Sequence, residues 1–133
     1  MIDELLNILR ALKSDPGRAV ELYEQLYRES FFALVQSGSE TDLQRHLFLN
    51  YPTNDGLREL PLFTKHEFVL PGMPDEALLV QINGPELWPR LLDIVETRKI
   101  EAAVDPGQPH GIRLTREMIL GMTAKYGQRR DAV

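Results

Sequence analysis

The chain has 133 residues, of which 43% are hydrophobic and 26% are charged, and its formal net charge at pH 7 is −5. This composition is typical of a globular protein, and the length predicts one domain that needs no metal or disulfide to stabilise its core. The absence of cysteine excludes disulfides, thiolate nucleophiles and cysteine-ligated metal centres. The excess of acidic residues argues against nucleic-acid binding, which usually needs a basic footprint.

The N-terminal sequence has no basic residues before its first apolar residues, so no signal peptide is predicted. No apolar run approaches the ~20 residues that a membrane-spanning helix requires. We therefore expect a cytoplasmic protein that does not bind membranes.

The first 29 residues predict a helical hairpin. Apolar residues recur at helical spacing over residues 2–13, which predicts an amphipathic helix. A Ser-Asp-Pro-Gly turn at residues 14–17 precedes a second helix, which is expected to end near Glu29. The predicted buried face of this second helix comprises Ala19, Leu22, Tyr23 and Leu26, with Tyr27 flanking it.

The next segments predict a strand and a hairpin. The aromatic and β-branched run at residues 31–35 is typical of a strand, and a helical turn is predicted over residues 42–46. Asp-Gly at residues 55–56 lies between two apolar runs, at residues 47–51 and 58–63, which indicates a β-hairpin. Pro61 lacks an amide proton. It therefore fits a central strand only where its backbone nitrogen does not face a neighbouring strand.

A capping box and a buried strand are predicted next. Thr64 and Glu67 have the spacing of a capping box, which predicts a short helix over residues 65–69. The nearly continuous apolar run at residues 77–82 indicates a strand covered on both faces. Asn83-Gly-Pro-Glu then begins a helix that is expected to run over residues 85–96.

The last third predicts two strands and a helix. The strands are expected at residues 100–104 and 112–114, and Thr115 is a plausible cap for the final helix. The fold class is therefore α/β of the α+β kind: a single mixed sheet of about five to six strands, with the helical hairpin at the N-terminus and helices packed on the sheet. We expect one domain over residues 1–133, divided into the hairpin (1–29), a mixed core (30–127) and a tail (128–133).

The sequence contains no strong catalytic or cofactor motif. No serine lies in a nucleophile elbow, and no glycine-rich phosphate loop occurs. The three histidines, His46, His66 and His110, are far apart and lack the spacing of metal ligands. We therefore expect no catalytic residues, no metal and no cofactor.

The candidate binding residues are Asp105, Gly107, His110 and Trp88. Asp105 and His110 lie in a loop that follows a strand, where ligands often bind in α/β sheets. Asp105 and His110 form either an acid–base pair or part of a rigid connection. The two prolines and two glycines of the loop favour the rigid connection. Trp88 is either a core residue of its helix, which its spacing favours, or a partly exposed anchor for a protein partner.

Several of these pieces resemble the N-terminal domain of the SseB family. They are a helix followed by Phe31–Val35, the Leu62-Phe-Thr64 entry to a short helix, and a strand–helix–strand unit that ends in a Pro-Gly turn. The resemblance covers about residues 16–125. The family pattern has Asn-Pro-Gly where this chain has Asp105-Pro106-Gly107; aspartate also forms turns but adds a negative charge. Longer relatives carry a second, C-terminal domain, whose functions are not carried over.

The resemblance implies a bacterial protein with a loose association with type III secretion and serine sensitivity, and it brings no catalytic residues. We therefore expect a non-catalytic protein–protein interaction module whose partner is a secretion component, a toxin that it neutralises, or a second copy of itself. The alternative is a small-molecule binder or weak enzyme that uses the Asp105–His110 loop. Nucleic-acid binding would need a basic patch; the residues for it would be Arg90, Arg98, Lys99 and Arg113.

Overall fold

The computed structural model describes residues 2–12, 14, 17, 19–36, 48–53, 55–69, 77–98 and 100–131. Four helices are present in this part of the chain: α1 (Ile2–Ala11), α2 (Ala19–Arg28), α3 (Gly84–Arg98) and α4 (Arg116–Asp131), with a short 3₁₀ helix, η3 (His66–Phe68). The strands are β1 (Ser30–Gln36), β2 (Tyr51–Pro52), β3 (Arg58–Phe63), β4 (Ala77–Asn83), β5 (Ile100–Val104) and β6 (Ile112–Leu114). The helical turn predicted over residues 42–46 lies outside the described residues.

The strands form one mixed sheet in the order β4-β1-β3-β5-β6, with β2 pairing with β3. The β3–β5 ladder is parallel, and the other ladders are antiparallel. The chain between β3 and β5 forms β4 and α3, so the two parallel strands are joined by a long crossover, as parallel pairing requires. The prediction of a single mixed sheet with an N-terminal helix pair is confirmed.

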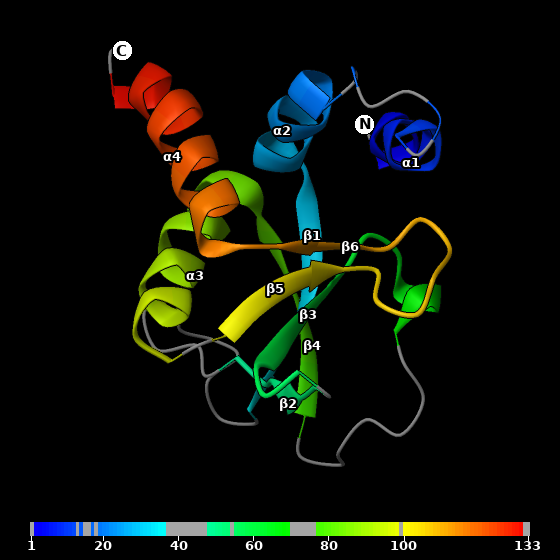
Figure 1. Cartoon of the computed structure of the whole chain (residues 1–133), viewed down its shortest axis with the longest axis vertical. Helices are drawn as coiled ribbons and strands as arrows, with labels where there is room; N and C mark the ends of the chain where they lie inside the picture. Colours follow the sequence, from blue (N-terminus) through cyan, green and yellow to red (C-terminus); the bar gives the residue numbers. More distant parts are fainter. Residues whose placement is uncertain are drawn as a thin grey trace.

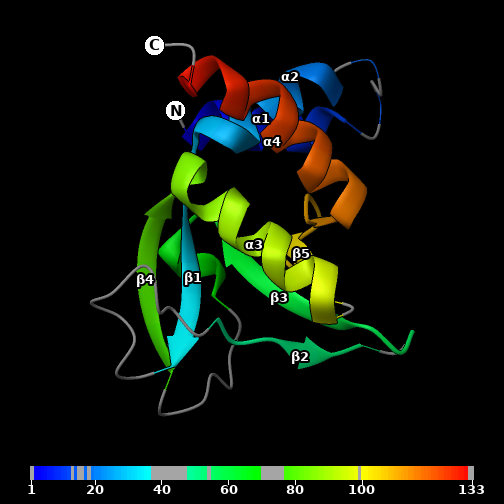
Figure 2. The same ribbon diagram turned by 90° about the vertical axis from the view of Figure 1, so that its left-hand side faces the viewer.

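Helices cover the two faces of the sheet unequally (Figures 1 and 2). Neighbouring residues of a strand point to opposite faces. Phe31 packs edge-on against Trp88 of α3, with ring centroids 5.4 Å apart, whereas Phe32 packs against His66 of η3 at 5.5 Å. The helix α3 therefore covers one face and η3 lies against the other, while α1, α2 and α4 gather at the upper end of the molecule in both views.

Pro61 lies in β3, which is a central strand, and the sheet accommodates its missing amide proton. The β1–β3 ladder pairs Phe32 with Phe63 and Ala33 with Leu62, and it stops before Pro61 would face Leu34. The carbonyl of Leu34 instead accepts a hydrogen bond of 2.9 Å from the amide of Leu49. A segment outside the strand therefore supplies the donor that proline lacks.

Three sequence predictions are wrong in detail. The strand β4 is an edge strand of the sheet, and Leu78 is 37% exposed, so β4 is not covered on both faces. Tyr27 is buried and Tyr23 only half-buried, the reverse of the expected face of α2. The ring of Tyr27 packs at a tilt against Tyr126 of α4, with ring centroids 5.9 Å apart, so α4 covers this side of α2. The helix α4 also continues to Asp131, through most of the segment expected to be a tail.

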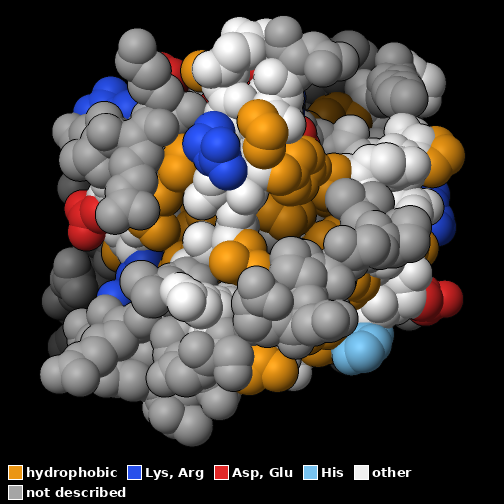
Figure 3. Space-filling view, turned by 90° about the horizontal axis from the view of Figure 1, so that it is seen from below, with side chains coloured by type: hydrophobic (Ala, Val, Ile, Leu, Met, Phe, Trp, Pro, Cys, Tyr) orange, Lys and Arg blue, Asp and Glu red, His pale blue; other side chains and the backbone are white. Residues whose placement is uncertain are grey.

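The lower end of the molecule is shown in Figure 3, where hydrophobic side chains gather near the centre. In the described part of the chain, no helix combines the length and the apolar character needed to cross a membrane.

Candidate functional site

The loop between β5 and β6 consists of two consecutive turns. The amide of Gln108 donates to the carbonyl of Asp105 at 3.1 Å, and the amide of Gly111 donates to the carbonyl of Gln108 at 2.9 Å. Each turn has proline at its second position, Pro106 in the first and Pro109 in the second, and proline already has the backbone angle that this position requires. Gly107 has a φ angle of +87°, which the third position of a type II turn demands. The predicted rigid connection is therefore present.

Asp105 is the anchor of this loop. Its side chain is fully buried, and its backbone has a φ angle of +50°, in the left-handed region that aspartate tolerates better than most residues. One carboxylate oxygen, Oδ1, accepts from the amide of Thr64 at 2.8 Å. The other, Oδ2, accepts from the hydroxyl of Thr64 at 2.6 Å and contacts Nε2 of His110 at 2.7 Å. Three donors thus satisfy the buried carboxylate and tie the loop to the end of β3.

This arrangement corrects the predicted capping box. The hydroxyl of Thr64 donates to Asp105, and no side chain caps η3 at Lys65, where the helix begins. A short helix does follow, at His66–Phe68, but it is a 3₁₀ helix without the reciprocal Thr64–Glu67 contacts. The threonine hydroxyl donates a charge-assisted hydrogen bond to the buried carboxylate, which is stronger than a hydrogen bond between neutral groups.

None of the hollows lined by described residues contains both Asp105 and His110. His110, which is buried, lines a hollow of about 380 Å³ between the end of α1 and the loop, together with Arg10 and Phe68. Asp105 is not among the lining residues and makes all of its side-chain contacts inside the protein. The acid–base pair proposed from the sequence exists as a contact, but its carboxylate cannot reach a substrate in this arrangement, so the contact acts as an internal anchor.

Trp88, the fourth candidate residue, belongs to the core. Its side chain is 0% exposed, its indole Nε1 donates to the carbonyl of Leu26 at 2.9 Å, and its ring packs edge-on against Phe31. The core interpretation is confirmed, and the alternative of an exposed anchor for a protein partner is wrong because no part of the ring reaches the surface.

The model of the family described as the SseB protein N-terminal domain matches residues 2–120. The chain belongs to the SseB N-terminal domain family. Searches of curated proteins and of solved structures gave no match. In this SseB domain the residue before the Pro-Gly turn is Asp105, whose two oxygens contact the amide and hydroxyl of Thr64 and Nε2 of His110. Asparagine would supply only one acceptor oxygen at this position.

Gly107 lies on the other side of the loop from His110. It borders a shallow hollow of about 350 Å³ beside β6, together with Tyr51, Glu59 and Arg113. Burial and the neighbouring carboxylate of Glu59 raise the pKa of Tyr51 to about 12. Gly107 and His110 therefore belong to different surfaces of this SseB domain and do not form a single site.

A pH titration tests the environment of Tyr51. The tyrosinate absorbance of the wild type should show one of its four tyrosines ionising near pH 12, and Tyr51→Phe should remove that component. Since the folded-state pKa lies above the ordinary value of 10, the unfolded chain loses this proton first, and stability should fall between about pH 10 and pH 12. An unchanged high-pH absorbance step in the variant would contradict this assignment.

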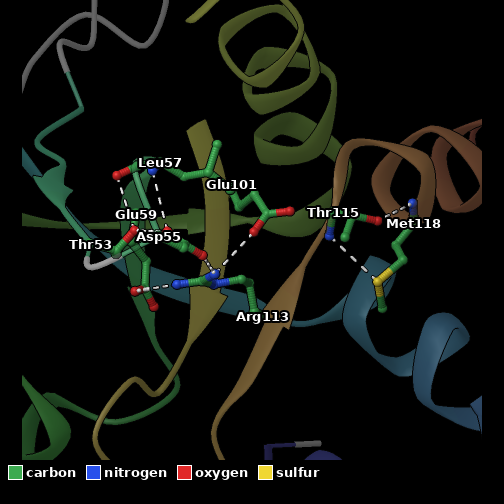
Figure 4. Close-up of polar contacts among 8 residues, drawn as sticks. All are labelled: Thr53, Asp55, Leu57, Glu59, Glu101, Arg113, Thr115 and Met118. Carbon is green, nitrogen blue, oxygen red and sulfur yellow. Dashed lines mark hydrogen bonds and ion pairs between the residues drawn. The ribbon is translucent and has the colours of Figure 1, made fainter. Parts of the chain in front are cut away.

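Arg113 of β6 lies among carboxylates from β3, from β5 and from the turn before β3 (Figure 4). Its guanidinium lies 2.7 Å from Asp55, 3.4 Å from Glu59 and 3.3 Å from Glu101. Hydrogen bonds from Thr53, from Arg113 and from the amide of Leu57 lower the pKa of Asp55 to about 2. These carboxylates neutralise the charge of Arg113, which is one of the four basic residues that a nucleic-acid-binding patch would need. They would also repel the phosphates of a nucleic acid.

A groove that the sequence analysis missed runs between α2 and α4. It has a volume of about 330 Å³ and is predominantly apolar. The described residues that line it are Val20, Tyr23, Glu117, Met118, Gly121, Met122, Lys125 and Tyr126. Val20 is 62% exposed and adds apolar surface beside the groove. The available sequence signal was Gly121, a glycine in the interior of a predicted helix.

Proposed function

We propose that this SseB domain is a non-catalytic protein-interaction module that binds a partner helix in the groove between α2 and α4. The observation that carries the proposal is the apolar lining of this groove, with Val20 exposed at its edge. An amphipathic helix that lays its apolar face into such a groove is a common mode of peptide recognition. Methionines 118 and 122 suit this role because their flexible side chains adapt to the shape of a partner.

Gly121 supports a close approach by the partner. Glycine in a helix interior costs about 1 kcal/mol relative to alanine. A Cβ atom at this position would meet no atom within 4 Å, so packing inside the domain does not require the glycine. Because Gly121 has no side chain, a partner helix in the groove can approach the backbone of α4 closely.

The charged residues of the groove indicate which helix fits. Glu117 and Lys125 both line the groove on α4 and lie eight residues apart, which corresponds to about 12 Å along a helix axis. Lys125 also lies 5.4 Å from the centre of the Tyr126 ring. The partner helix should therefore carry a basic residue opposite Glu117 and an acidic residue opposite Lys125, on either side of an apolar stripe.

Filling the groove tests the proposal. Tagged wild type and Gly121→Trp are used to capture proteins from a lysate of the native host, and the captured proteins are quantified by mass spectrometry. A specific partner should be retained by the wild type and reduced at least about tenfold by the variant, since hot-spot contacts are worth about 2 kcal/mol or more. A peptide made from the partner's apolar helical segment should then compete.

Ala124→Trp provides the matched control, because Ala124 is exposed on the same helix and does not line the groove. This variant and Gly121→Ala should both keep the partner, and circular dichroism should show all variants folded. Equal loss of the partner in the two tryptophan variants, or no protein retained specifically by the wild type, contradicts the groove as the docking surface.

A further inference from the structure

The hollow beside His110 has the features of a binding site for a small molecule. It is bounded on one side by the last turn of α1 and on the other by η3 and the loop between β5 and β6, which lie together at the right of Figure 1. Its volume of about 380 Å³ is within the range of small-ligand pockets. The described lining residues are Leu9, Arg10, Phe68, Gln108, Pro109 and His110.

The polar groups of this hollow favour an anion. Arg10 is exposed, and no carboxylate pairs with it in the part of the chain that the structure describes. Its guanidinium offers donors in a planar fork that matches a carboxylate. The side chain of Gln108 adds an amide that can donate to a second ligand atom.

His110 lines the hollow in a fixed orientation. Nε2 contacts the Asp105 carboxylate, and the ring lies 5.3 Å from that of Phe68. Two rigid turns hold the loop, so the ring needs no reordering when a ligand binds.

We infer that this hollow binds a small organic carboxylate with an apolar body. The carboxylate would pair with Arg10, and the body would lie against Leu9, Phe68 and Pro109. A single negative charge is preferred over the double charge of a phosphate ester, because the Asp105 carboxylate next to His110 opposes additional negative charge. This site is separate from the α2–α4 groove and shares no described lining residue with it.

Benzoate and benzamide serve as the test pair, since they share an aromatic ring and differ in the carboxylate. The ¹⁵N–¹H spectrum of the wild-type protein is followed while each compound is added at constant ionic strength and pH. Benzoate should shift the amides of Arg10, Phe68, Gln108 and His110 saturably, and benzamide should bind at least about tenfold more weakly, as expected when a charge-assisted hydrogen bond is lost.

Arg10→Gln should weaken benzoate binding at least about tenfold, for the same reason. Arg28→Gln is the matched control: it removes the same charge from an exposed arginine that pairs with Glu24 at 3.0 Å and does not line the hollow. Equal affinity for benzoate and benzamide, unchanged affinity in Arg10→Gln, or no shifts in these amides would overturn the inference. Because Arg10 lies outside the α2–α4 groove, none of these outcomes bears on the proposed protein interaction.

Discussion

Asp105→Ala is expected to lower the free energy of unfolding by about 3–5 kcal/mol, because each buried polar group left without its partner costs about 1–3 kcal/mol. The substitution leaves the amide and hydroxyl of Thr64 and Nε2 of His110 without their acceptor inside the protein. It also places alanine at a φ angle of +50°, which alanine adopts less readily than aspartate. Urea denaturation followed by circular dichroism measures the change.

Asp105→Asn is the control for this prediction. Asparagine tolerates the same backbone conformation and keeps one oxygen for the Thr64 amide, so the loss should be smaller, about 1–2 kcal/mol. A change below about 1 kcal/mol in Asp105→Ala, smaller than a single net hydrogen bond usually contributes, would show that the cluster does not anchor the loop.

The second large effect is expected at Trp88. Trp88→Ala should destabilise the domain by about 3–5 kcal/mol, since it removes a fully buried ring between α3, α2 and β1. Trp88→Phe keeps an aromatic ring but leaves the carbonyl of Leu26 without its donor, so its cost should be about 1–3 kcal/mol.

Urea titrations followed by far-ultraviolet circular dichroism compare the three proteins, because the variants lack the one tryptophan that would report by fluorescence. In the wild type, the emission of that tryptophan should be that of a ring shielded from water and should move to longer wavelength on unfolding. Loss of partner binding in Trp88→Ala with unchanged stability would instead support an interface role for this residue.

Local patterns predicted most of the elements because each reports a short stretch of chain. The apolar runs at residues 31–35, 77–82 and 100–104 lie within β1, β4 and β5, and Thr115 caps α4 by accepting from the amide of Met118 at 3.3 Å. Strand order depends on pairings between distant segments, which a short apolar run does not encode. The position of β4 at the edge of the sheet was therefore not predicted from its sequence.

The candidate site shows the same division between local and distant information. The turn residues predicted a rigid loop, and the two proline turns are present. The partner of Asp105 was not predictable, because Thr64 lies 41 residues away and its spacing to Glu67 suggested a local role. The groove between α2 and α4 was missed for a similar reason: Gly121 was visible in the sequence, but the open space beside it depends on where α2 lies.

The order of strands in the sheet has a consequence for synthesis of the chain. The strand β1 emerges from the ribosome before both of its neighbours, β3 and β4, and β3 in turn awaits β5. Until those strands appear, the apolar run Phe31–Val35 has no sheet to join, and such exposed runs promote aggregation. We therefore expect β1 to stay unpaired during synthesis until β3 and β4 have emerged.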